Sequence, residues 1–226
     1  MRTLVVQRLR LIYGITGALS YASVLDIGRL WERLLHRAQM PLTYTQGFNP
    51  HPRLQFAAAL AVGYTSSYEV LDLLLSELVD PEETLGKLRA QCPAGLTILL
   101  IEQVPLDAPS PQATLRQISY RLEIQTGASV AEIQHSIAVL LAQASFFYQR
   151  QRKGQTKSFD MRPLVLDIRY IGEQACQHII MLDLLFRAEG SIRPEEVISA
   201  LALPIERLVI HRTALFWGEG QKEVCA

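Results

Sequence analysis

The segment Leu71–Leu75 (LDLLL) and the turn Asp80–Glu83 (DPEE) that follows it decide the fold, because this pair occurs twice in the chain. The second copy is Leu182–Phe186 (LDLLF) with Arg193–Glu196 (RPEE). Each copy predicts a strand, a turn and an amphipathic helix, since proline is tolerated at the first helical position and glutamates there oppose the positive end of the helix dipole. The same three elements in the same order indicate an internal duplication.

The two halves also begin alike. Alternating apolar and polar residues predict a strand at the start of each half, and a predicted helix follows each strand. In the first half the strand is 4–13 and the helix 23–38, and in the second half the strand is 115–125 and the helix 130–142. The last strand of each half follows its second helix, at 96–104 and 207–216. The order β-α-β-β-α-β predicts an α+β fold of tandem ferredoxin-like units, in which helices cover one face of an antiparallel sheet.

A proline-rich segment separates the halves, with three prolines between residues 105 and 111. Such a cluster is typical of a connection between folded parts. We therefore expect a first half at 1–104, a joint at 105–112, a second half at 113–220 and a flexible tail at 221–226.

The composition is that of a folded protein whose overall charge selects no partner. Of the 226 residues, 49% are hydrophobic, and 22 basic residues balance 22 acidic ones. No apolar run reaches the about 20 residues of a membrane span, so no membrane association is expected. The three cysteines are widely spaced, which favours a reducing, cytoplasmic location. No phosphate-binding glycine loop, zinc-protease motif or paired Cys/His spacing is present, so no metal or cofactor is expected and the question of catalysis stays open.

The predicted helix 23–38 carries a basic stripe formed by Arg29, Arg33 and Arg37. Residues spaced by four fall within about 80° of arc on a helix, opposite the apolar residues of the same segment. Guanidinium groups in a row can hold phosphates by charge and by paired hydrogen bonds. The alternative is an ordinary solvated helix face.

The segment Tyr44–Arg53 (YTQGFNPHPR) is the second candidate site. Its prolines fix the backbone and remove hydrogen-bond donors, and its glycine permits a tight turn or a close approach to a ligand. The alternative is a structured turn without a ligand. The candidate residues of this segment are Tyr44, Gln46, Gly47, Asn49, His51 and Arg53.

The third candidate lies between residues 150 and 162, where five basic residues accompany Asp160 alone. Locally basic segments commonly contact polyanions, and a solvated connection is the alternative. Lys157, Asp160 and Arg162 are the candidates here. Asp72 and Asp183 look like a carboxylate pair, but their equivalent places in the repeat favour outward-facing strand residues over an acid/base dyad.

These segments together resemble the bacterial radical-SAM-associated domain of unknown function, which is usually fused behind or encoded beside a radical-SAM protein. The resemblance covers roughly residues 5–215. It is carried by Ser23–Asp26, the three arginines, Pro41–Leu42, Tyr44–Arg53, Val62–Gly63, Lys157, Asp160–Pro163 and Arg212–Leu215. It implies a radical-SAM partner and adds Arg212 to the candidate residues. Where that family usually has a histidine on the first helix, this chain has Val24, and its cysteines cannot form the CxxxCxxC motif of a radical-SAM enzyme.

Three functions follow as alternatives. The first is a non-catalytic accessory module that binds a substrate, with RNA as the ligand considered first, for a radical-SAM partner. The second is an RNA-processing or RNA-modifying enzyme that uses His51, Tyr44 or Asp160, and the third is a protein–protein scaffold. For the first alternative we expect the arginines of the first half and Lys157–Arg162 to converge on one anion-binding cleft between the halves.

Overall fold

Strands and helices form two successive units in the computed structural model, which describes residues 4–152, 155–187 and 191–218. The units comprise residues 1–115 and 116–226. The side chains of 150–152 and 155–157 lie outside the described part, as does the tail expected at 221–226. The α+β class and the mostly antiparallel pairing predicted from the sequence are confirmed.

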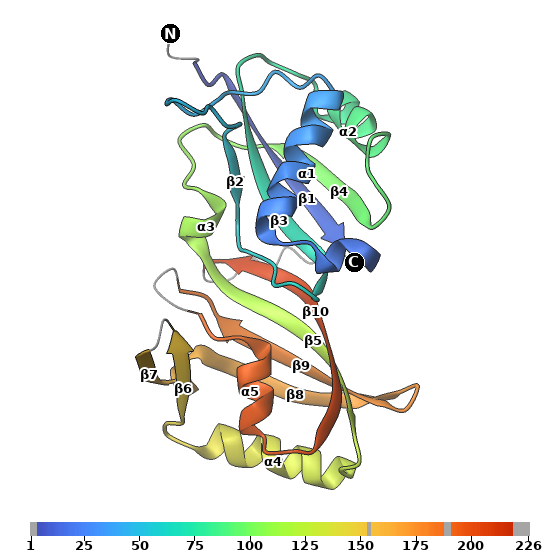
Figure 1. The fold of residues 1–226 in the computed structure, drawn as a ribbon, viewed down its shortest axis with the longest axis vertical. Coiled ribbons are helices and arrows are strands. Elements are labelled where there is room, and N and C mark those ends of the chain that lie inside the picture. Colours follow the sequence, from blue (N-terminus) through green and yellow to red (C-terminus); the bar gives the residue numbers. More distant parts are fainter. Residues whose placement is uncertain (1–3, 153–154, 188–190, 219–226) are drawn as a thin grey trace. The chain divides into compact units, whose positions relative to one another are not determined.

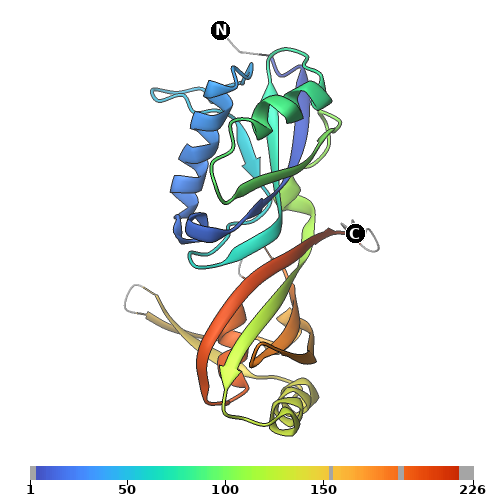
Figure 2. The ribbon, with the colours of Figure 1, turned by 90° about the vertical axis from the view of Figure 1, so that its right-hand side faces the viewer.

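The first unit has the element order strand, helix, strand, strand, helix, strand (Figure 1). Its elements are β1 (Gln7–Ile15), η1 (Gly17–Tyr21), α1 (Val24–Arg37), β2 (Leu54–Phe56), β3 (Thr65–Leu75), α2 (Pro81–Arg89), β4 (Leu96–Gln103) and the short α3 (Pro111–Thr114). The strands lie in the order β4-β1-β3-β2. Both helices α1 and α2 cover the same face of this sheet, as the two views in Figures 1 and 2 show.

Alternation along the strands builds the core of the first unit. Every second residue of β1 and β3, from Leu9 to Ile15 and from Leu71 to Leu75, joins one buried cluster with Trp31, Leu34 and Leu35 of α1. α2 begins as predicted, because Asp80 caps it by accepting the Glu83 backbone N–H at 2.8 Å and Pro81 occupies the first helical turn. The helix-covered face of the sheet therefore holds one continuous apolar core.

The second unit repeats this order with one inserted hairpin. Its elements are β5 (Leu115–Thr126), α4 (Val130–Ala142), β6 (Phe147–Arg152), β7 (Gln155–Asp160), η2 (Arg162–Leu164), β8 (Val165–Gln174), β9 (Gln177–Leu185), α5 (Pro194–Ala200) and β10 (Ile205–Trp217). Its main strands lie in the order β10-β5-β9-β8, and β6 pairs with β7. A capping box of Ser129 and Glu132 begins α4.

The proline-rich segment expected as a joint packs on the first unit. The Arg8 guanidinium donates to the carbonyls of Ala108 and Pro109, and α3 contacts β2 and β3. Within 4–152, 155–187 and 191–218, the helices are too short or too polar to cross a membrane.

Candidate functional site

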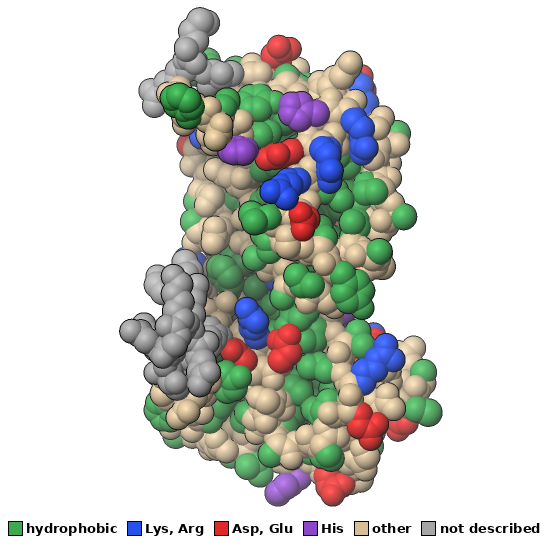
Figure 3. Space-filling view, in the orientation of Figure 1, with side chains coloured by type: hydrophobic (Ala, Val, Ile, Leu, Met, Phe, Trp, Pro, Cys, Tyr) green, Lys and Arg blue, Asp and Glu red, His purple; other side chains and the backbone are tan. Residues whose placement is uncertain are grey.

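Helix α1 presents the arginine stripe to solvent. Trp31, Leu34 and Leu35 are fully buried on its inner face. Arg29, Arg33 and Arg37 are exposed on the opposite face, and a row of basic side chains is visible over this helix in Figure 3. The stripe predicted from the spacing of four is therefore available to a ligand.

Two side-chain contacts join α1 to the loop 44–53. The Tyr44 hydroxyl and His36 Nε2 are 3.2 Å apart, and His51 Nδ1 lies 3.8 Å from a carboxylate oxygen of Glu32. Glu32 and His36 are one turn apart on α1, so they fix both ends of the loop along the helix. The arginine row and the loop consequently share one surface, which we call the α1–loop surface.

Backbone hydrogen bonds close the base of the loop and leave its tip in solvent. The Thr45 N–H donates to the His51 carbonyl at 2.8 Å, and the Arg53 N–H donates to the Thr43 carbonyl at 2.8 Å. The tip residues Gln46, Gly47, Phe48, Asn49 and Pro50 are all exposed. Gly47 has φ +145°, a conformation that other residues rarely adopt, so glycine is required here by the backbone and not by crowding.

Phe48 is the most exposed large apolar side chain of the described residues, at 105% relative accessibility. The exposure of such a ring is unfavourable, because its apolar surface stays in contact with water. Exposed aromatic rings are side chains on which single-stranded bases can stack. No pattern in the sequence pointed to a role for this residue.

The α1–loop surface carries more positive than negative charge. Four arginines face two carboxylates, Asp26 and Glu32. Asp26 lies 3.4 Å from Arg29, and the Ser23 hydroxyl holds the pKa of this carboxyl below its usual value. Within the described residues, the side chains of Arg33 and Arg53 make no hydrogen bond or ion pair. These two guanidinium groups are therefore the ones most able to bind an added anion.

The candidates of the second unit are engaged within their own fold. The Asp160 carboxylate accepts the backbone N–H groups of Phe146 and Arg162, both at 3.0 Å. Arg162 donates to the carbonyls of Leu141 and Val165, at 3.1 and 3.0 Å. Lys157 lies in β7, and its side chain is outside the described part. A role in anion binding for these residues stays a prediction.

Arg212 is 2% exposed in β10, and its guanidinium lies 5.8 Å from the centre of the Tyr120 ring. A buried guanidinium at this distance packs favourably on the face of an aromatic ring. The role that the resemblance implies for Arg212 also stays a prediction.

The expectation that Asp72 faces outward is wrong. Asp72 is fully buried, and its carboxylate pairs with Arg8 at 2.5 Å and with Arg10 at 2.9 Å. The segment that follows β4 supplies further partners for Arg8, the carbonyls of Ala108 and Pro109. Alternation predicted the face on which Asp72 lies, but it did not show that this face is covered.

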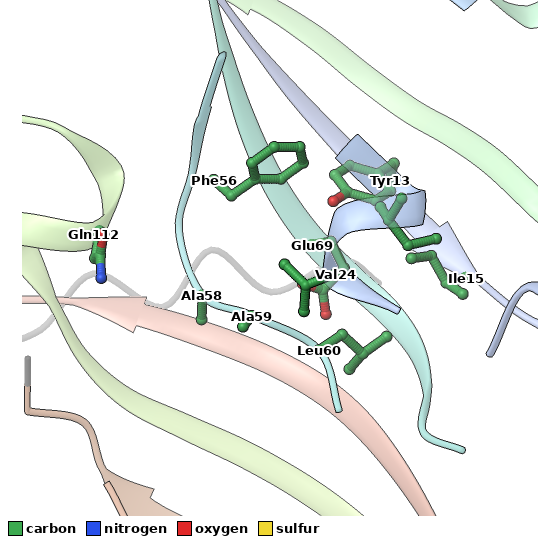
Figure 4. Close-up of a pocket in the computed structure, with 10 residues that line it drawn as sticks. Tyr13, Ile15, Val24, Phe56, Ala58, Ala59, Leu60, Glu69 and Gln112 are labelled. Atoms are coloured by element: carbon green, nitrogen blue, oxygen red, sulfur yellow. The ribbon is translucent and has the colours of Figure 1, made fainter. Parts of the chain in front are cut away.

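A pocket that sequence analysis missed lies at the N-terminal end of α1 (Figure 4). Its cavity volume is about 220 Å³, and its lining comes from β1, β3, α1, α3 and the stretch from β2 to Leu60. The pocket contains Tyr13 and the buried carboxyl of Glu69, which is 2% exposed. Val24, which stands at the position of the histidine expected from the resemblance, lines it too.

No cluster of three or more His, Cys, Asp or Glu side chains suited to a metal occurs in the described ranges.

A model of the family described as "Uncharacterized protein conserved in bacteria (DUF2344)" matches residues 8–194, and the chain belongs to this family. The match agrees with the predicted resemblance to a bacterial domain of unknown function, while the link to radical-SAM proteins stays a prediction. No curated protein sequence matches the chain.

Chains of several solved complexes resemble this chain in fold. A chain of a Cbf5-Nop10-Gar1 complex has 9% identity and a TM-score of 0.46, with 91% of this chain and 48% of that chain covered. A chain of an H/ACA RNP bound to a substrate RNA containing 2'-deoxyuridine has 12% identity and a TM-score of 0.46, with 90% and 47% covered. The chain thus spans about half the length of the chains it matches, and the RNA and the other proteins named belong to those complexes.

Proposed function

We propose that this member of the family is a non-catalytic accessory module that binds single-stranded RNA on the α1–loop surface and works with a radical-SAM partner. The observation that carries the proposal is the junction of the arginine row with the loop 44–53 through the Tyr44–His36 and His51–Glu32 contacts. It joins the exposed arginines to a loop whose tip has an exposed aromatic ring, Phe48.

The chemistry of the surface suits a polyanion with stacking bases. Arginine binds phosphate through a fork of N–H donors, and the release of counterions makes such binding favourable at low salt. From Arg29 to Arg37 the helix rises by about 12 Å, which is longer than one phosphate group. A ligand with several phosphates therefore suits the row better than a single phosphate does. The Phe48 ring offers a face to a base, a contact that adds about 1–3 kcal/mol in single-stranded RNA complexes.

The fold and the resemblance support the accessory role. The strand orders β4-β1-β3-β2 and β10-β5-β9-β8 match each other element by element, and we interpret them as two ferredoxin-like units that arose by duplication. Domains of the resembling family accompany radical-SAM proteins, and this chain lacks their cluster-binding cysteines. The catalytic chemistry would then belong to the partner, and substrate binding to this chain.

One observation favours a second candidate function, an RNA-processing enzyme. The His51 imidazole faces the Glu32 carboxylate at 3.8 Å beside the arginine row. A carboxylate that orients an imidazole is a common arrangement for a general base. This alternative predicts that purified protein cleaves the RNA it binds and that His51→Ala abolishes cleavage.

The experiment is a salt titration of RNA affinity with a short single-stranded oligouridylate. The Arg33→Ala variant is compared with Lys87→Ala, which removes an exposed cation from α2 of the same unit. We expect Arg33→Ala to lower the slope of log K against log salt by about 0.7, the value for one phosphate contact on a single strand. We expect Lys87→Ala to behave like the wild type. Absence of binding by the wild type at low salt, or equal slopes for all three proteins, would exclude the α1–loop surface as an RNA site.

A further inference from the structure

The pocket at the N-terminal end of α1 has mostly apolar walls and one buried acid. Ile15, Ile27, Phe56 and Leu60 form much of the wall, and Figure 4 shows the Phe56 side chain directed from β2 toward Tyr13. The cavity of about 220 Å³ is open to solvent. A cavity of this kind takes a small ligand with a large apolar surface and a few polar atoms.

Glu69 gives the pocket its chemical preference. It lies on β3 directly opposite Tyr13 on β1, so both side chains emerge on the helix-covered face of the sheet. A carboxylate in an apolar setting disfavours anions and is stabilised by hydrogen-bond donors. Its two oxygens offer about four acceptor positions, so Glu69 can accept ligand N–H groups in addition to its contacts within the chain.

We propose that this pocket binds one base of the RNA strand, and that guanine fits it best. This inference rests on the proposed function. The flat face of a base would pack on Phe56 and the aliphatic wall, while Glu69 accepts hydrogen bonds from the base edge. Guanine presents two adjacent N–H groups on its Watson–Crick edge, a match for the two oxygens of one carboxylate. Uracil presents a single N–H between two carbonyls, and those carbonyls would face the acid unfavourably.

The pocket and the arginine row are within reach of one RNA strand. Val24 and Ile27 of the first helical turn line the pocket, and Arg29 follows on the next turn of the same helix. From Val24 to Arg29 the helix rises by about 7.5 Å, which corresponds to about two nucleotide repeats of about 3.4 Å on one strand. A base in the pocket can therefore remain connected to phosphates on the arginine row.

The base-binding test compares an oligouridylate that contains one central guanosine with the all-uridine strand. We expect wild-type protein to bind the guanosine strand about tenfold more tightly, within the range for a bidentate base contact. Glu69→Gln keeps the shape of the side chain and loses the matched pair of acceptors, and Ala58→Leu fills the cavity from its wall. Both variants should lose the preference for guanosine and keep the salt dependence of the all-uridine strand. Arg33→Ala should weaken both strands equally and keep the preference.

A second measurement separates this inference from the proposed function. Free guanosine, which has no phosphate, is titrated into the protein, and chemical-shift changes of the Phe56 and Tyr13 ring protons are followed by NMR. Saturable changes with guanosine that are absent with uridine and lost in Ala58→Leu support the pocket even if no RNA strand binds. Strand binding with equal affinity for both oligonucleotides, and no ring shifts with guanosine, would leave the α1–loop surface intact and overturn the base pocket. Ring shifts with a small alkylamine and none with guanosine would overturn it as well, in favour of a cationic ligand.

Discussion

Asp72 on β3 and Asp183 on β9 stand at the same place in the two copies of the repeat, yet their surroundings differ. Asp72 is fully buried between Arg8 and Arg10. Asp183 keeps 15% of its side-chain exposure, accepts a hydrogen bond from the Ser119 hydroxyl and lies 3.3 Å from Arg169. Their partners differ, because Arg10 is opposite Asp72 and Arg8 also pairs with it, whereas Ser119 is opposite Asp183. A repeat can thus keep a residue while the neighbouring strand changes what that residue does.

The largest effect should come from removing one charge of the buried cluster. Asp72→Asn leaves Arg8 buried without its carboxylate, which should lower the free energy of unfolding by about 3–5 kcal/mol. Asp183→Asn affects a partly solvated contact and should cost about 1 kcal/mol or less. Urea unfolding of both variants measures this comparison. Equal losses would show that burial does not distinguish the two aspartates.

An intermediate effect should separate the arginines of the two units. Arg162→Ala removes a guanidinium that holds two carbonyls of the second unit, and should cost about 1.5–3 kcal/mol. Arg33→Ala removes an exposed side chain and should change the free energy of unfolding by less than about 0.5 kcal/mol. The same urea unfolding measurements, made beside RNA titrations, test both statements. If Arg33→Ala proves the more destabilising variant, the interpretation of its side chain as available for binding is wrong.

The smallest effect concerns the first turns of α1 and α4, which share one device. The hydroxyl of Ser23 lowers the pKa of Asp26, and the hydroxyl of Ser129 lowers the pKa of Glu132. A carboxyl group whose pKa is lower in the folded than in the unfolded protein stabilises the folded state at pH values above the unfolded-state pKa. This contribution is lost as the pH falls through the pKa of the folded state. Ser129→Ala should therefore raise the pKa of Glu132 toward its ordinary value and leave that of Asp26 unchanged. NMR titration of the two carboxyl groups measures this, and a parallel shift at Asp26 would contradict it.

The sequence predicted those parts of the structure that depend on neighbouring residues. The helix expected at 23–38 is α1 at Val24–Arg37, and its arginine row is exposed as its spacing indicated. The loop 44–53 lies beside this helix because few residues separate the two. The caps of α2 and α4 follow from residues within one turn of each other.

The remaining features depend on residues that are distant in the sequence. Tyr13, Phe56 and Glu69 meet in the pocket from three different strands, so no local spacing connects them. One local signal existed, since Glu69 interrupts an apolar strand just where a buried residue is expected. The burial of Asp72 depends on partners as far along the chain as Arg8 and Ala108. Alternation along one strand does not reveal that a distant segment of the chain covers that face of the sheet.

Each unit contains one of the two tryptophans of this chain, Trp31 in the first and Trp217 in the second. Trp31 is wholly shielded from water and meets the Tyr13 ring edge-on at 4.9 Å, whereas Trp217 is partly exposed. The unmodified protein therefore contains an optical probe for each unit. Replacing either indole by phenylalanine would assign the fluorescence change to one unit and reveal which of the two opens first under denaturant.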